Sequence, residues 1–95
     1  MPNDMALFIK ETKRAYDVKE LIYIEKPLSL HSYEEFSVKI TNISNDYIYI
    51  KTTSGSLCWA FEDIEDLTRE SNKPHVVYNF YINNTEYYLV MNLAL

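Results

Sequence analysis

The feature of this sequence most suggestive of chemistry is a run of carboxylates between residues 62 and 70. Five acidic side chains there face a single arginine, Arg69, so the run carries a net charge of −4 of the whole chain's −5. Complementary charge of this kind speeds association with a basic partner and helps to select it. We predict that the contact is made by Glu62, Asp63, Glu65 and Asp66.

Two other interpretations of the run compete with a partner contact. A solvated helix face, whose early acids favour the positive end of the helix dipole, explains the charges without any partner, and it stays open. A calcium loop needs oxygen ligands at alternating positions around a central glycine, which this run lacks. We therefore predict no metal site and no cofactor.

Catalytic motifs are missing from the sequence. A single glycine, Gly55, cannot build a phosphate-binding loop or the nucleophile elbow G-x-S-x-G. His31 and His75 lie far apart in the sequence and belong to no H-E-x-x-H motif. No neighbouring residue in the sequence is of a type that would activate the Cys58 thiol. We predict that the protein is not an enzyme and has no catalytic residues.

Tyrosine is unusually frequent, with nine in 95 residues. Tyr47 and Tyr49 alternate with two isoleucines and so face the opposite side of a predicted strand. Either a second layer, such as the N-terminal helix, covers them, or they are exposed. Exposed tyrosines are large amphipathic anchors that protein interfaces favour. We predict that these two flank the acidic contact.

Other partners and locations are limited by charge and composition. The chain is acidic and has no run of Lys and Arg, so direct binding to nucleic acid is not expected. Membrane binding is not expected either, because the first 26 residues balance five acids against five bases. With no signal-like or membrane-spanning apolar segment and one cysteine, we predict a cytoplasmic location. Seven lysines against two arginines favour a low-GC bacterium or its phage.

Hydrophobic periodicity predicts the elements that position these residues. Apolar residues at helical spacing predict an N-terminal helix capped by Asn3 or Asp4. A short apolar run predicts a strand at 21–24, and alternating patterns predict strands at 34–40, 47–50 and 57–61, with Trp59 in the core. A hairpin of 76–82 and 85–91 follows, in which a two-residue Asn83-Asn84 turn pairs Ile82 with Thr85 and Val76 with Met91.

The acidic run itself is predicted to be a short helix over residues 62–70, because Ile64 and Leu67 lie one helical turn apart. Pro74 would prevent the helix from continuing. The whole chain, residues 1–95, is therefore predicted to be a single α+β domain. Its expected fold is an N-terminal helix plus a curved antiparallel sheet or small barrel of five or six strands, with the short acidic helix before the C-terminal hairpin.

These features predict a small acidic protein-binding module that inhibits or modulates a larger partner with a basic surface. Its sharpest form is an inhibitor from a phage or mobile element that mimics the charge of nucleic acid. One alternative is an immunity protein or antitoxin that covers a toxin's active site. Another, from a different class, is an oligomeric structural or assembly component, joined through an exposed edge strand or the apolar end at residues 89–91.

Overall fold

The described part of the chain forms one α-helix followed by seven strands in chain order. The computed structural model describes the backbone of residues 2–29, 32–52 and 55–92, and the side chains of residues 4–26, 38–52 and 55–92. The elements are α1 (Pro2–Asp17), β1 (Ile22–Ser29), β2 (Ser32–Ile43), β3 (Tyr47–Thr52), β4 (Gly55–Ala60), the 3-10 turn η1 (Phe61–Asp63), β5 (Glu65–Asn72), β6 (His75–Ile82) and β7 (Thr85–Asn92).

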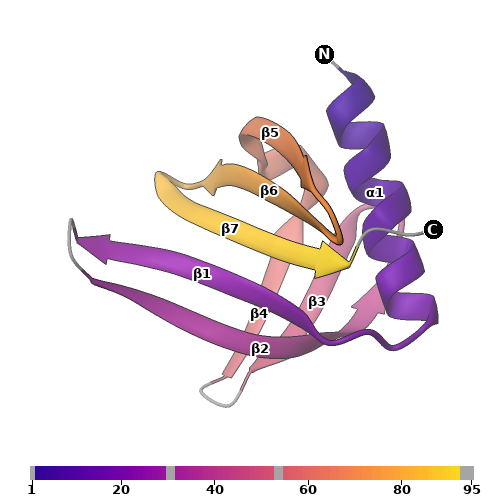
Figure 1. The fold of residues 1–95 in the computed structure, drawn as a ribbon, viewed down its shortest axis with the longest axis horizontal. Helices are drawn as coiled ribbons and strands as arrows, with labels where there is room; N and C mark the ends of the chain where they lie inside the picture. The colour runs from indigo at the N-terminus through magenta and orange to yellow at the C-terminus, as the bar shows by residue number, and fades with distance from the viewer. Residues whose placement is uncertain (1, 30–31, 53–54, 93–95) are drawn as a thin grey trace.

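All seven strands form one strongly curved antiparallel sheet, a half-barrel. The strand order is β4-β3-β2-β1-β7-β6-β5, so β1 pairs with both β2 and β7. The sheet is open only between its two edge strands, β4 and β5, in the part of the chain that the structure describes. The short turn η1 joins these two edges covalently. Helix α1 lies across one end of the sheet and packs against β2 and β5 (Figure 1).

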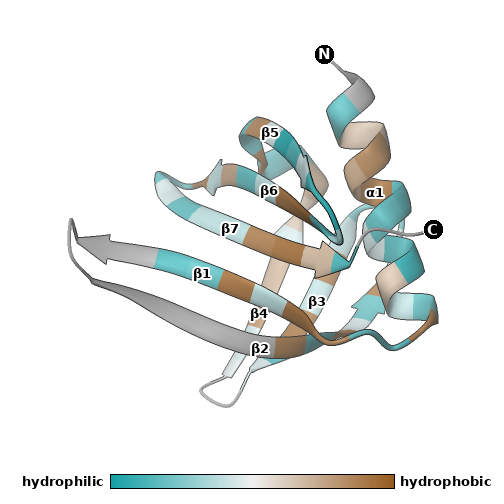
Figure 2. Ribbon diagram, viewed as in Figure 1, coloured by the Kyte–Doolittle hydropathy of each residue, from teal (hydrophilic) through white to brown (hydrophobic). Residues whose placement is uncertain are grey.

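The core fills the concave side of the sheet. Alternate residues point inward along the strands, and Figure 2 shows this alternation of apolar and polar residues along β1. From α1, Phe8 is fully buried, and its ring lies 4.9 Å from that of Tyr78 and 5.6 Å from that of Phe80. Trp59 is buried, as predicted. The helix therefore contributes the central Phe8 ring and the buried Ala15 to a core that is built mostly by the sheet.

The helix begins earlier than the sequence suggested. It starts at Pro2, so Asn3 and Asp4 lie within its first turn and do not cap it. Proline suits this position, since the first helical N–H groups have no partner within the helix. At the other end, Lys19 adopts a left-handed conformation (φ 57°), and the N–H of Glu20 donates to the carbonyl of Ala15. The chain can then turn directly into β1.

The predicted fold was wrong in strand number and in the acidic segment. The sheet has seven strands, not five or six, because residues 65–72 form β5, and the predicted helix over 62–70 is reduced to the turn η1. The reason is a bulge: one extra residue lies in β5 between Glu65 and Thr68, where Asp66 has φ 55°. An extra residue places Ile64 and Leu67 on the same inner face at a spacing of three. That spacing resembles one turn of a helix.

The C-terminal hairpin agrees with its prediction. Ile82 pairs with Thr85 and Val76 with Met91, as the two-residue turn required. Asn83 and Asn84 both have positive φ, at 50° and 64°, which is the geometry of the tight turn that joins twisted strands. This hairpin brings Tyr78 and Phe80 under α1.

Candidate functional site

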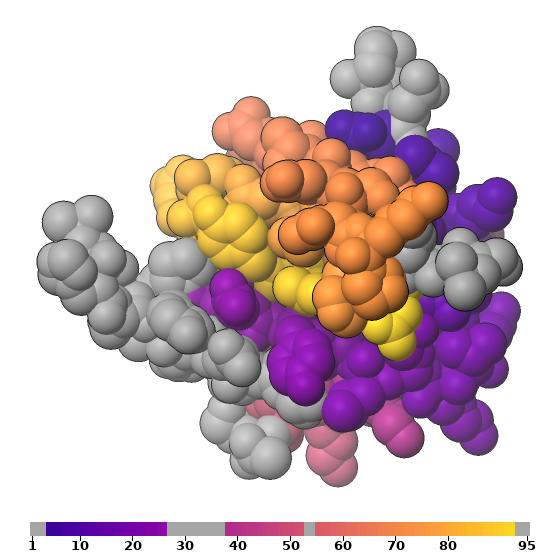
Figure 3. Space-filling view, in the orientation of Figure 1, coloured from indigo at the N-terminus to yellow at the C-terminus, as the bar shows by residue number. Residues whose placement is uncertain are grey.

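The predicted acidic residues lie together on one rim of the half-barrel. Glu62 and Asp63 belong to η1, and Glu65 and Asp66 begin β5. All four are exposed, while Ile64 between them packs against the core. In Figure 3 this segment, coloured salmon to orange, forms the upper rim of the molecule. The bulge at Asp66 keeps successive carboxylates directed at solvent.

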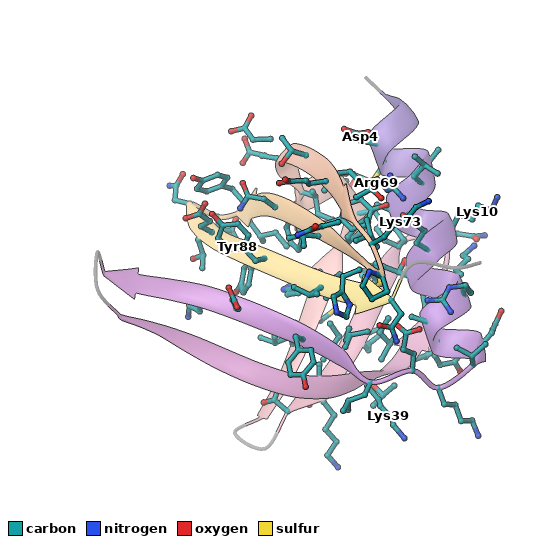
Figure 4. All side chains as sticks on the ribbon, viewed as in Figure 1. Asp4, Lys10, Lys39, Arg69, Lys73 and Tyr88 are labelled. Atoms are coloured by element: carbon teal, nitrogen blue, oxygen red, sulfur yellow. The ribbon has the colours of Figure 1, made fainter. Side chains whose placement is uncertain are left out.

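Arg69, the only cation within this run, points away from the carboxylates. Its guanidinium donates from Nε to Glu11 Oε1 at 2.9 Å and from Nη2 to Glu11 Oε2 at 3.0 Å. Tyr78 joins this group: its hydroxyl donates to Glu11 Oε1 and accepts from Arg69 Nε at 3.2 Å. Figure 4 shows Arg69 between β5 and α1. The charge of Arg69 is therefore matched by Glu11, and the rim keeps its negative charge.

The ionisation of this group follows from its geometry. Burial alone would raise the pKa of the Glu11 carboxyl, but the bonds from Arg69 and Tyr78 and the nearby positive charge together outweigh it, so the pKa is lowered. Burial, and next the bond to Glu11, raise the pKa of Tyr78 well above its usual value. Glu11 is thus held charged and Tyr78 neutral, the states in which the phenol donates to the carboxylate.

Tyr47 and Tyr49 lie on the outer face of β3, uncovered by α1. Their side chains are 43% and 40% exposed, and their ring centroids are 5.9 Å apart. Tyr49 faces Cys58 of β4, and this neighbour, through a hydrogen bond first and charge repulsion second, raises the pKa of the phenol. The two rings therefore form an exposed aromatic pair on the outer face of β3.

A pocket connects Tyr47 to Glu62 of the acidic rim. Its volume is about 270 Å³, and it is lined by Asn45, Asp46, Tyr47, Ala60, Phe61 and Glu62. It thus brings together one residue from each predicted set, Tyr47 and Glu62. Two carboxylates beside an aromatic ring suit an arginine or lysine side chain, through charge and through the ring face. Glu65 and Asp66 lie outside the pocket lining.

Three residues near the rim were not among the predicted contact residues: Asp46, Tyr81 and Glu86. Asp46 lines the pocket, and the sequence placed it in a turn. Tyr81 pairs with Glu65 on one side and with Glu86 on the other, and Glu86 first, then burial, raises its pKa. The hairpin register would have placed Glu86 opposite Tyr81. What the sequence lacked was β5, whose pairing brings the acidic run beside them.

The rest of the surface shows where charge of the opposite sign lies. Lys39 and Lys51 face each other across β2 and β3 and are exposed, and Figure 4 shows Lys39 directed away on the lower side. His75 is exposed, whereas His31 lies outside the described residues. Within the described ranges, no group of three or more His, Cys, Asp and Glu is arranged to hold a metal ion. Nor does any described helix have the length and apolarity to cross a membrane.

Comparison with known proteins finds no family model, no curated protein and no solved structure that matches the chain.

Proposed function

We propose that this chain is a small acidic protein-binding module that docks on a larger partner with a basic surface and inhibits or modulates it. Glu62, Asp63, Glu65 and Asp66 make the charged contact, and Tyr47 and Tyr49 are the flanking anchors. The carrying observation is the inward pairing of Arg69 with Glu11, because it leaves the exposed carboxylates of the run without their nearest cation in the sequence.

The arrangement also supports a more specific version, in which the rim mimics nucleic-acid phosphates. Exposed carboxylates from two successive elements present several negative charges along one edge. The pocket beside them has the lining to receive a basic side chain of the partner. Such a contact would give fast, salt-dependent association, while the tyrosine rings would supply apolar area. An inhibitor of a nucleic-acid enzyme from a phage or mobile element fits this description.

The test is capture of a partner from the lysate of a low-GC bacterium. The immobilised wild type is compared with a variant carrying Glu62→Gln, Asp63→Asn, Glu65→Gln and Asp66→Asn, which keeps side-chain size. A control variant removes carboxylates elsewhere, with Asp4→Asn, Asp17→Asn and Glu25→Gln. We expect one stoichiometric protein on the wild type and the control, lost from the rim variant and released by salt.

Competition with DNA then tests whether the rim mimics nucleic-acid phosphates. If the rim imitates phosphates, double-stranded DNA added to the lysate should release the same protein. Equal capture by the rim variant would place the contact elsewhere on the molecule. If the wild type captures nothing at low salt, the proposed binding function is wrong.

A further inference from the structure

The edge strand β4 has hydrogen-bonding groups directed away from the sheet. The N–H of Phe61 donates to the carbonyl of Asp46 at 2.9 Å, and this pair extends the β3–β4 register in which Tyr47 faces Ala60. Bonded and non-bonded pairs alternate in an antiparallel ladder. The backbone groups of Ser56, Cys58 and Ala60 therefore point away from β3. Within the described chain, no further strand pairs with this edge.

The β4 edge also lacks the features that usually protect a free edge. Natural sheets guard their edges with charged side chains, prolines or bulges. β5, the other edge, has both charges and a bulge. The β4 sequence GSLCWA has no charge and no proline, and its pairing with β3 is regular. On its outer face stand only small side chains, Ser56, Cys58 and Ala60.

We propose that the β4 edge pairs antiparallel with β4 of a second copy of this chain, about a twofold axis at Cys58. In this register Cys58 lies opposite Cys58 of the second copy, and Ser56 opposite Ala60. The N–H groups of all three residues and the carbonyls of Ser56 and Cys58 then find partners, and the Ala60 carbonyl, which as N-cap of η1 already accepts one hydrogen bond, accepts a second. No charged side chains are opposed. The small side chains leave the outer face of the joined sheet unobstructed.

Charge complementarity favours this occupant and this direction. Ala60 is followed by Glu62 and Asp63, whereas Ser56 has Lys51 as its neighbour on β3. Antiparallel pairing brings Glu62 and Asp63, which follow the end of β4, near Lys51 of the other copy. The twofold axis makes this contact occur twice. A parallel arrangement would oppose like charges instead. The other self-association surface suggested by the sequence, residues 89–91, is unsuitable because Leu89 and Met91 are buried in the core.

The backbone pairing of β4 does not rest on the proposed function, although Glu62 and Asp63 belong to both contacts. Tyr47 and Tyr49 stay on the outer face of the joined sheet, and the start of β5 is not part of it. The dimer would therefore present two tyrosine pairs on one continuous surface. The rim variant loses the attraction between residues 62–63 and Lys51 but keeps the backbone of β4, so its loss of partner capture and the protection of the β4 amides in the unmodified chain are separate results.

Amide hydrogen exchange tests the proposal on the unmodified chain, kept reduced. The amides of Ser56, Cys58 and Ala60 should be protected at millimolar concentration and exchange faster on dilution to micromolar, in parallel with dimer dissociation in sedimentation equilibrium. A chain that stays monomeric throughout, or exchange at these amides that does not depend on concentration, would overturn it.

Variants then test the register. Cys58→Glu places like charges opposite each other and should raise the dimer dissociation constant about tenfold. Thr68→Glu, the same charge change on β5, should not. Lys51→Glu should weaken the dimer, and adding Glu62→Lys to it should restore association. The β4 pairing would be refuted if Cys58→Glu left the dimer dissociation constant unchanged. It would also be refuted if adding Glu62→Lys to Lys51→Glu did not restore association.

Discussion

The two edge strands of the half-barrel, β4 and β5, are attached to the core in different ways. β4 is held by aromatic packing, since the Trp59 ring lies 5.2 Å from that of Phe80 and 5.0 Å from that of Tyr87. β5 offers smaller, partly buried apolar side chains and is tied to α1 through the Arg69–Glu11 pair. The outer surfaces differ accordingly, because β4 is uncharged there and β5 is acidic.

This contrast shows how one short sheet can carry two kinds of edge. Apolar packing needs no charge, so the outside of β4 can consist of small neutral residues and remain open to backbone pairing. β5 is attached through an ion pair instead, in which Arg69 of β5 bonds to Glu11 of α1. The carboxylates on the outside of β5 then protect that edge from pairing and remain free to contact a basic partner.

The largest expected effect concerns the attachment of β4. Replacing Trp59 by alanine should lower the free energy of unfolding by about 3–5 kcal/mol, because it removes a buried ring and leaves a cavity. Urea denaturation followed by circular dichroism measures this. Tyr49→Ala, on the exposed face of the neighbouring strand, is the control and should cost far less. A small loss for Trp59→Ala would mean that β4 is not attached by this ring.

A somewhat smaller effect is expected for the attachment of β5. Arg69→Met keeps the apolar stem but leaves the Glu11 carboxylate partly buried and unpaired, so we expect a loss of about 2–3 kcal/mol, below the range for fully buried pairs. Adding Glu11→Gln should recover part of this loss, which a double-mutant cycle measures. Purely additive losses would show that the pair does not couple α1 to β5.

The smallest effect is a pH dependence of stability that comes from the group of Glu11, Arg69 and Tyr78, which joins β5 to α1. Because the folded pKa of Glu11 is lowered, its stabilising contribution is present above the ordinary carboxyl pKa of 4.5 and is lost as pH falls below it. The raised pKa of Tyr78 acts at the other end, where stability falls as pH rises above about 10. Glu11→Gln should flatten the acid side of the unfolding free energy relative to wild type. An unchanged acid slope would contradict this assignment.

Local patterns were sufficient where an element's own residues decide its structure. The period of the first segment predicted α1, and the alternation of Leu57, Trp59 and Phe61 predicted a buried Trp59. In the C-terminal hairpin the two-residue turn set the register, and a shift by one residue would have exposed its apolar face. The alternation of apolar residues and the two-residue turn indicate the same register there, so both the strands and their pairing could be predicted.

Patterns failed where an element depends on distant residues. The spacing of Ile64 and Leu67 fits a helix, and only pairing with β6 turns this segment into a bulged strand. The exposure of Tyr47 and Tyr49 could not be read from alternation either, because it depends on where α1 packs. The sequence identified the acidic residues of the candidate site, but not the pocket that links Tyr47 to Glu62.

What the sequence alone determined, therefore, was the N-terminal helix, most of the strands, the last hairpin and the position of the charge. Periodicity and turn chemistry act over a few residues, and these features need nothing more. Only the tertiary structure decided that β5 exists, that Arg69 turns inward to Glu11, and that β4 ends the sheet with an unprotected edge. Each of these depends on contacts between residues far apart in the chain, such as Glu11 with Arg69, and these arise only when the sheet curves around its core.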